Sequence, residues 1–297
     1  MQPAVLIYNP RSGSYHPKRL PPLREALRAA GYDAEPRPTT GPGAATEIAR
    51  QAAADGVTTV FANGGDGTVR ETAAGLLGTE VVLGVLPAGT ANVLVRAFNL
   101  PMRPLDIARR IGDYEPRLID VGRLSNSSGD AMPFLMMASC GLDAQVMARE
   151  MPISKRILGR FAYGWEIFKG WMTYGYPTLK AHGDQGEALP GSLIVTANVA
   201  QYGGAFKMAP DADFADGLLD LVVFNGRRGA TAGLIRDLIL GRHMKRSDIS
   251  VQQVRHVEID APANVRIQID GDVVDVKPPW TLSLAQERLR VLLPPQH

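Results

Sequence analysis

The stretch Asn63-Gly64-Gly65-Asp66-Gly67-Thr68 decides the fold of the first half of this chain. It follows an apolar, β-branched run at 57–62, which predicts a buried strand, and precedes 69–77, which predict a helix. Glycines at such a junction let the backbone turn sharply and approach another group closely. The N–H groups of the loop and of the helix N-terminus favour an anion, so a phosphate is the expected ligand. Asp66 in this electropositive loop implies a cation or a proton nearby. The spacing fits neither the P-loop nor the Rossmann fingerprint.

The N-terminal part of the chain alternates strands and helices. Strands are predicted at 4–8, 57–62 and 81–86, and helices at 20–30, 47–54, 69–77 and from the 87–92 loop through 98. This alternation implies a parallel sheet covered on both faces, with ligands beyond the carboxyl ends of the strands. Asn9, Gly64–Thr68 and Gly89–Asn92 all follow predicted strands. We therefore expect a nucleotide at that edge.

The second half of the chain is rich in short strands. Apolar runs separated by turn signals occur at 118–124, 134–140, 193–199, 218–224, 254–259, 265–269 and 273–276. Strands at this spacing suggest a β-sandwich. Two helical patterns interrupt them, at 153–174 and 230–243. The sequence thus predicts an α/β domain at 1–117 and a β-sandwich-like domain at 118–297.

Composition limits the class of protein. The 297 residues are enough for two domains. The formal net charge is only +2, so a bulk electrostatic attraction to nucleic acid is not indicated. The single cysteine, Cys140, excludes an internal disulfide and fits a reducing compartment. The first residues predict a strand rather than a signal peptide, and no apolar run reaches the ~20 residues of a membrane span. We expect a cytoplasmic protein, either soluble or peripheral at the inner face of the membrane.

The block Gly64–Thr68 resembles the GGDGT signature that diacylglycerol kinases, sphingosine and ceramide kinases, NAD kinases and, more distantly, phosphofructokinases share. Asn9-Pro10, Thr39, Glu71 and the Pro-Ala-Gly-Thr-Ala-Asn run at 87–92 occur in the order of the lipid-kinase branch. The resemblance implies a first domain of the NAD kinase and phosphofructokinase type that binds ATP. The positions on its nucleotide loops are Asn9, Thr39, Gly64, Gly65, Asp66, Gly67, Thr68, Val69, Arg70, Glu71, Gly89, Thr90 and Asn92. Taken singly, Asn9-Pro10 is also typical of a strand-ending turn, and Thr39 of a helix cap. The chain departs from many members at Asn92-Val93, where they have Asn-Asp.

An acidic segment of the second half carries a further resemblance. Residues 203–220 resemble a segment of the bacterial lipid kinases in which the positions of Asp213, Asp216 and Leu218 form a structural magnesium site. Carboxylate and carbonyl oxygens in a tight turn suit a hard cation. The alternative is a plain Asp-Gly turn that enters a strand.

The other acidic segment is Asp270-Gly271-Asp272, whose pattern predicts a type I′ hairpin turn. The resemblance assigns the catalytic base to its third position, usually Glu and here Asp272. Such a carboxylate accepts the hydroxyl proton during attack on the γ-phosphate. The resemblance also implies that the GGDGT amides and a magnesium ion near Asp66 neutralise charge. Catalysis would require Asp272 to face the nucleotide across an interdomain cleft.

Two basic, partly apolar segments leave alternatives open. On a helical wheel, residues 153–174 place an aromatic apolar arc beside Arg156 and Arg160. This pattern fits a core helix and also a helix at a membrane surface. The cluster Arg242–Arg246 predicts a helix end with favourable dipole charges, with anionic-lipid contact as the alternative.

Together these features predict an ATP- and magnesium-dependent lipid kinase, with Asp272 and Asp66 as catalytic residues. Its expected partners are ATP and a lipid alcohol such as diacylglycerol, with peripheral membrane contact and a homodimer left open. The alternatives are an NAD kinase, which shares GGDGT, and an inactive lipid- or nucleotide-binding module.

Overall fold

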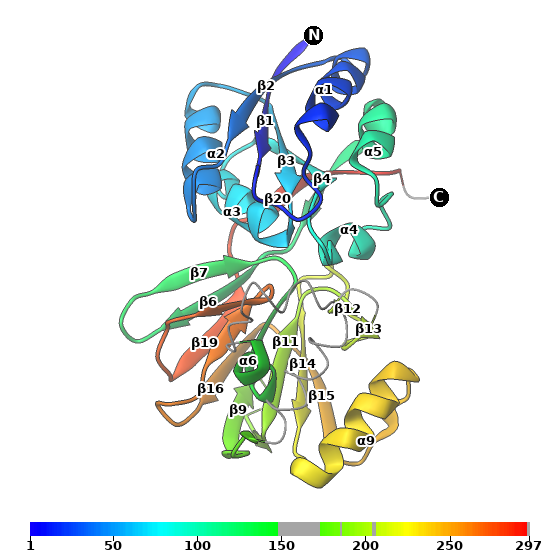
Figure 1. Cartoon of the computed structure of the whole chain (residues 1–297). Coiled ribbons are helices and arrows are strands. Elements are labelled where there is room, and N and C mark those ends of the chain that lie inside the picture. Colours follow the sequence, from blue (N-terminus) through cyan, green and yellow to red (C-terminus); the bar gives the residue numbers. More distant parts are fainter. Residues whose placement is uncertain (148–172, 185, 204–205, 296–297) are drawn as a thin grey trace. The chain divides into compact units, whose positions relative to one another are not determined.

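The computed structural model describes residues 1–147, 173–184, 186–203 and 206–295. They form two compact units (Figure 1). The first consists mainly of Met1–Val121 and the C-terminal segment from Ala285, and the second lies within Gly122–Leu284. The sequence analysis assigned everything after residue 117 to the second domain. It did not anticipate that the end of the chain returns to the first unit.

The first unit is built on a six-stranded sheet in the order β2-β1-β3-β4-β20-β5. Neighbouring strands are parallel except β20 and β5, which pair antiparallel. The strands are β1 (Gln2–Tyr8), β2 (Tyr32–Pro38), β3 (Thr59–Gly64), β4 (Val82–Pro87), β5 (Glu115–Ile119) and β20 (Leu289–Leu293). Every residue of the central strand β3 is buried, as expected for a parallel strand covered on both faces. The predicted α/β architecture is confirmed.

Five α-helices accompany this sheet: α1 (Leu20–Ala29), α2 (Ala44–Ala54), α3 (Asp66–Leu76), α4 (Val93–Ala97) and α5 (Pro104–Arg110). Helix α2 packs on α3, and α1 packs on α5. The two pairs lie on opposite sides of the sheet (Figure 1). Short 3-10 turns precede α1 (Pro17–Arg19) and follow α5 (Ile111–Asp113).

The strand β2 was not predicted from the sequence. It contains Pro36 and Pro38, which cannot donate to a sheet and argue against a central strand. The structure resolves the conflict by placing β2 at the edge of the sheet, where only one side pairs.

The second unit contains two antiparallel sheets of six strands each, in the orders β10-β9-β16-β19-β6-β7 and β15-β14-β11-β8-β17-β18. The first has β6 (Gly122–Asn126), β7 (Ala131–Phe134), β9 (Leu179–Gly183), β10 (Ala188–Gly191), β16 (His256–Asp260) and β19 (Trp280–Leu284). The second has β8 (Met137–Gly141), β11 (Leu193–Ala197), β14 (Leu219–Phe224), β15 (Ile249–Val254), β17 (Ile267–Ile269) and β18 (Asp272–Val274). A small hairpin joins β12 (Gln201–Tyr202) and β13 (Phe206–Lys207). The predicted β-sandwich-like domain is confirmed.

Strand β14 is buried on both faces. Leu219, Leu221 and Val223 belong to the core that the two sheets share, together with the fully buried Trp280. Alternate residues such as Val222 face a second apolar cluster on the other side. Helix α9 (Arg228–Ile239) contributes Leu234 to that cluster, and α6 (Leu142–Met147) contributes Leu142. A 3-10 turn, His243–Lys245, follows α9.

Three apolar runs that the sequence predicted as single strands are each divided in two, the third of them (254–259) between β15 and β16. The run 118–124 changes sheets between β5 and β6, and the run 134–140 breaks between β7 and β8. At the second break, the N–H groups of Leu135, Met136 and Met137 all donate to the Asp270 carboxylate instead of a strand. Within the described ranges, no helix is long and apolar enough to cross a membrane.

Candidate functional site

Three loops of the first unit meet beyond the carboxyl ends of β1, β3 and β4. The Asn9 N–H donates to the carbonyl of Asn63, and the Ala88 N–H donates to that of Gly64. The Asn9 amide Nδ2 also reaches Thr68 Oγ1, at 3.2 Å. The loops after three neighbouring parallel strands thus form one hydrogen-bonded edge, where ligands of such sheets bind.

The GGDGT loop and the loop after β4 touch through their glycine backbones. A Cβ atom on Gly89 would lie 2.6 Å from the Cα of Gly65, closer than real atoms approach. A Cβ on Gly64 would lie 2.4 Å from Thr68 Cβ. Gly65 is the N-cap of α3, which starts at Asp66. The glycines are therefore needed for close approach of backbone to backbone, at the N-terminal end of a helix.

A pocket of about 280 Å³ opens at this edge. Its lining consists of Asn9, Arg11, Thr39, Gly41, Pro42, Gly67, Thr68 and Glu71. The structure therefore brings together five of the residues assigned to the nucleotide: Asn9, Thr39, Gly67, Thr68 and Glu71. Arg11 and the N-terminal turn of α3 offer hydrogen-bond donors to an anion, whereas Glu71 gives the same pocket an acidic acceptor.

Asp66 is held by the amides of another helix. Its Oδ1 accepts the Leu94 N–H at 3.2 Å, at the start of α4. Burial raises the pKa of Asp66, and hydrogen bonds from the Val93 and Leu94 backbone oppose that rise. The sequence analysis required a cation or a proton near this carboxylate. The N-terminal amides of α4 already provide part of that stabilisation, so the local geometry gives no separate reason to place a metal ion there.

Glu71 plays a similar part at the start of α2. Its two carboxylate oxygens accept the N–H groups of Gly43, at 2.9 Å, and of Ala45, at 3.3 Å. The Thr46 hydroxyl donates to the Glu71 carbonyl oxygen. The N-cap residue of α2 is Gly43, which makes no side-chain cap, so Glu71 satisfies these N–H groups from α3.

The other assigned positions divide by exposure. Thr90 is exposed at the tip of the loop after β4, whereas Val69 is buried in the core and Arg70 is half-buried. The Asn92 side chain closes its own loop: it accepts the Gly89 N–H at 2.9 Å and donates to the Gly89 carbonyl at 3.0 Å. Asn92 is buried and has a positive φ of 46°. Its visible contribution is to shape the loop.

The turn in the second unit has the predicted hairpin geometry. Ile269 pairs with Asp272 across β17 and β18, and the two residues between them have φ of 51° (Asp270) and 90° (Gly271). Positive φ at both central positions defines a type I′ turn. Asp272 is exposed at the start of β18. Asp270 instead is buried, with three backbone N–H donors at 2.8–3.0 Å.

The acidic loop before β14 keeps its carboxylates close to its own backbone. Asp213 Oδ1 accepts the Ala215 N–H, and Asp216 Oδ1 accepts the Leu218 N–H. Burial, with the negative charges of Asp216 and Asp211, raises the pKa of Asp220 to about 6. Among the residues that the structure describes, no three His, Cys, Asp or Glu side chains form a group that could hold a metal ion. A cation at this loop would therefore need backbone carbonyls as well as carboxylates.

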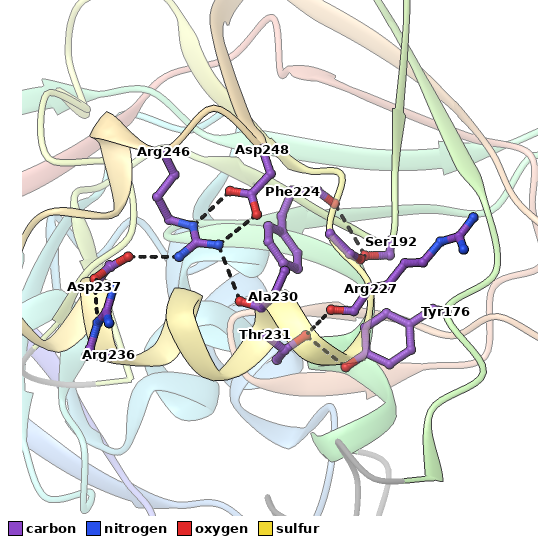
Figure 2. Close-up of polar contacts among 11 residues, drawn as sticks. Tyr176, Ser192, Phe224, Arg227, Ala230, Thr231, Arg236, Asp237, Arg246 and Asp248 are labelled. Carbon is purple, nitrogen blue, oxygen red and sulfur yellow. Dashed lines mark hydrogen bonds and ion pairs between the residues drawn. The ribbon is translucent and has the colours of Figure 1, made fainter.

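Two residues of the cluster Arg242–Arg246, His243 and Arg246, are engaged within the unit (Figure 2 shows Arg246), whereas Arg242 and Lys245 are exposed. Arg246 pairs with Asp237 at 2.8 Å and with Asp248 at 2.7 Å, and its Nη2 donates to the Ala230 carbonyl. His243 is buried, with Nε2 2.9 Å from the Met208 carbonyl oxygen. Arg246 thus ties the end of α9 to β15, which favours the structural interpretation of this cluster. The predicted amphipathic helix at 153–174 lies almost entirely outside the described residues.

Sequence reasoning missed the polar residues that hold these sites. Asn63 donates from Nδ2 to the Leu86 carbonyl and so joins β3 to β4 at the GGDGT loop. Asp143 is buried and accepts hydrogen bonds from Ser139, Tyr202 and Gln268. The available signal was a charged residue within an apolar stretch, because a buried carboxylate needs partners.

These observations define a protein with an α/β unit, which carries a pocket at its sheet edge, and a β-sandwich unit, and comparisons with known proteins agree with this architecture. Residues 3–124 match the diacylglycerol kinase catalytic domain, and 136–293 match the YegS C-terminal NAD kinase beta sandwich-like domain. The chain is 32% identical to a Chromohalobacter salexigens protein named "Probable lipid kinase YegS-like", over 86% of this chain and 83% of that protein. It is 28% identical to a diacylglycerol kinase of Bacillus subtilis, over 99% of this chain and 97% of that protein.

A solved structure has the same fold. The crystal structure of a diacylglycerol kinase from Bacillus anthracis matches 99% of this chain and 97% of its own, with a TM-score of 0.74 and 20% identity. That identity establishes the fold alone. From the sequence matches, the chain belongs to the diacylglycerol kinase family that includes the YegS-like lipid kinases.

Proposed function

We propose that this protein is an ATP-dependent lipid kinase that phosphorylates the free hydroxyl of diacylglycerol or a related lipid alcohol. The observation that carries the proposal is the pocket at the edge of the first sheet. It combines the N-terminal turn of α3 with Asn9, Thr39 and Glu71, and it lies in the part of the chain that matches the diacylglycerol kinase catalytic domain.

Within this proposal, different residues of the pocket bind different parts of the nucleotide. The backbone N–H groups from Gly65 to Thr68 hold phosphate oxygens, because they open the N-terminus of α3. Glu71 is an acceptor and would repel a phosphate, so it faces the hydroxyl or amino groups of the nucleoside. Asn9, which bonds Thr68 at 3.2 Å, holds the two loops in register. Gly89, Thr90 and Asn92 support the loops around the phosphates, and the negative charge of Asp66 would hold the Mg²⁺ that is bound with ATP.

Asp272 supplies the general base. As the lipid hydroxyl oxygen forms a bond to the γ-phosphorus, its proton passes to the Asp272 carboxylate, and the bond from the γ-phosphorus to the bridging oxygen of ADP breaks. The products are ADP and a phosphorylated lipid, which for diacylglycerol is phosphatidic acid. Asp272 is exposed, which suits a carboxylate that must reach a substrate. Aspartate is one methylene shorter than the Glu usual at this position.

Magnesium enters the proposal in two places. Mg²⁺ bound with ATP supplies charge neutralisation on the phosphates. Separately, the carboxylates of Asp213 and Asp216 with the Leu218 carbonyl are the candidate structural site. Asp213 and Asp216 lie in one tight loop and already turn their carboxylates toward backbone N–H groups of that loop, and such oxygen ligands suit a hard cation.

The acceptor places the enzyme at a membrane. A lipid alcohol lies in the bilayer and ATP lies in the cytoplasm, so we propose a cytoplasmic enzyme that acts at the inner face of the membrane.

Transfer of labelled γ-phosphate from ATP with magnesium tests the proposal. Diacylglycerol in mixed micelles, a sphingoid base and NAD serve as parallel acceptors. Label in the diacylglycerol fraction is the expected result. Label in the NAD fraction alone would overturn the lipid acceptor while it left the nucleotide site standing. The absence of label with every lipid alcohol, despite ATP binding, would favour an inactive binding module.

A further inference from the structure

A buried polar network connects α6 to the turn that carries Asp272. Asp143 in α6 accepts hydrogen bonds from the Ser139 hydroxyl, from the Tyr202 hydroxyl and, at 3.1 Å, from Gln268 Nε2. Gln268 Nε2 also donates to Ser139 Oγ at 2.7 Å. Ser139, Asp143 and Gln268 are only 1%, 8% and 1% exposed. Four polar side chains thus occupy one enclosed position in the sandwich unit.

The strand register explains how these residues meet. Gln268 on β17 lies directly opposite Ser139 on β8. Its neighbours Ile267 and Ile269 belong to the core between the two sheets, so Gln268 faces the other way. Helix α6 packs on β8, β17 and β18, which brings Asp143 over this pair.

The network fixes the orientation of the Gln268 amide. Asp143 Oδ2 and Ser139 Oγ both accept hydrogen bonds from Gln268 Nε2, so the NH₂ group of the amide faces them. The carbonyl oxygen Oε1 is then directed away from Asp143. It accepts the Gly271 N–H at 2.6 Å. Asp143 therefore acts on the central residue of the turn through one intermediary.

A second anchor holds the other side of the same turn. The Asp270 carboxylate accepts the N–H groups of Leu135, Met136 and Met137, and the Asp270 N–H donates to the Met137 carbonyl at 2.9 Å. Asp270 carries a positive φ, a conformation in which a non-glycine residue needs support from its surroundings. Asp272 follows directly after these two anchored residues.

We propose that Asp143 is a positioning residue for phosphoryl transfer: through Gln268 it holds the Asp270–Gly271–Asp272 turn and thereby fixes the Asp272 carboxylate. This inference rests on the proposed function, because it takes Asp272 as the base. A displacement of about 1 Å in a catalytic group can cost on the order of 10²-fold in rate, so a rigid turn has a direct kinetic value.

Two substitutions break the network at different points, and a third serves as a control. Asp143→Asn keeps the shape but presents an NH₂ group to Gln268, which disturbs the amide orientation. Gln268→Leu keeps the volume but removes the acceptor for Gly271. Thr196→Val is the control, because Thr196 is fully buried on β11, beside β8 in the same sheet, and within the described residues its Oγ1 has no hydrogen-bond partner.

The first readout does not depend on catalysis. Amide hydrogen exchange at Gly271, measured by NMR on the full chain, reports the Gln268 contact, because Gly271 is otherwise exposed. Both network variants are expected to raise that rate by on the order of tenfold, as loss of one hydrogen bond implies, while Thr196→Val leaves it unchanged. Unchanged exchange at Gly271 in folded Gln268→Leu would overturn the proposal.

The second readout is kinetic and separates this inference from the proposed function. In the mixed-micelle assay, the network variants are expected to lower kcat by roughly 10- to 100-fold with an unchanged KM for ATP, while Thr196→Val keeps both. Faster exchange with normal kcat would refute the catalytic consequence. If Asp272→Asn keeps full activity, the assignment of the base fails instead, and the exchange rates still report whether the network holds the turn.

Discussion

In the first unit, the loops around Asp66 meet through a direct backbone contact, whereas in the second unit the turn around Asp272 is held by buried side chains. Gly65 and Gly89 touch directly, and helix N-terminal amides hold Asp66 and Glu71. Around Asp272, the turn is held by hydrogen bonds to the carboxylate of Asp270 and to the side-chain amide of Gln268. Where two loops meet through glycine backbone, even an added methyl group is expected to destabilise the contact. A side-chain network should tolerate substitutions that keep its hydrogen bonds.

The largest expected effect is the loss of phosphoryl transfer on substitution of Asp66. Two variants separate the role of its negative charge in activity from the role of its hydrogen bonds in stability. We expect Asp66→Ala to abolish measurable phosphoryl transfer and to lower the free energy of unfolding by about 1–3 kcal/mol, because the α4 amides lose their acceptor. Asp66→Asn keeps an acceptor oxygen for the Leu94 N–H and should recover most of that stability without the activity. Chemical denaturation and the transfer assay measure the two quantities. Full stability in Asp66→Ala would mean that the α4 contact contributes nothing.

The next effect concerns the base. Asp272→Asn should lower kcat by about 10²–10⁴-fold, the range for loss of a general base, with little change in stability because the side chain is exposed. ATP binding, measured by calorimetry, should stay as in the unsubstituted protein. Asp272→Glu, which restores the family's usual length, is the matched variant and should keep activity. Equal turnover by the Asn variant would remove Asp272 from the mechanism.

A third substitution tests the backbone contact between the two glycine loops. In Gly89→Ala the new Cβ would lie 2.6 Å from the Cα of Gly65, and a backbone atom cannot move aside cheaply. We expect about 1–3 kcal/mol lower stability and roughly tenfold weaker ATP binding. The control is Gly229→Ala in α9, where the described residues place no atom within 4 Å of the new Cβ. Normal ATP affinity in Gly89→Ala would contradict the role of this contact.

The smallest effect is a pH dependence at the acidic loop. Because burial and neighbouring charge raise the pKa of Asp220 to about 6, the folded state binds a proton more tightly than the unfolded state. The protein should therefore lose stability as the pH rises from about 4 to about 6, by about 1 kcal/mol once solvent screening is included. Thermal melts of Asp220→Asn should show a flatter profile over this window. An identical pH profile in that variant would assign the titration elsewhere.

Local patterns in the sequence were sufficient for much of the fold. Alternating strands and helices, followed by short β runs, predicted both architectures. They could be recognised because apolar residues recur along the chain at the spacing that a buried strand or helix face requires. The GGDGT stretch placed a strand, a turn and a helix N-terminus correctly. The edge strand β2 was not predicted, because its prolines argue against a strand in the sequence although an edge strand tolerates them.

The sequence by itself determined the fold class, the family motif and five of the residues that line the pocket at the sheet edge. Only the tertiary structure decided what holds them: the amides of α4 at Asp66, the contact of Gly65 with Gly89, and the link from Asp143 through Gln268 to Gly271. These contacts join residues far apart along the chain, such as Gln268 and Asp143, which are separated by 125 positions. Periodicity and motif spacing record only neighbours in sequence, so the partners of a buried polar group emerge once the sheets are assembled.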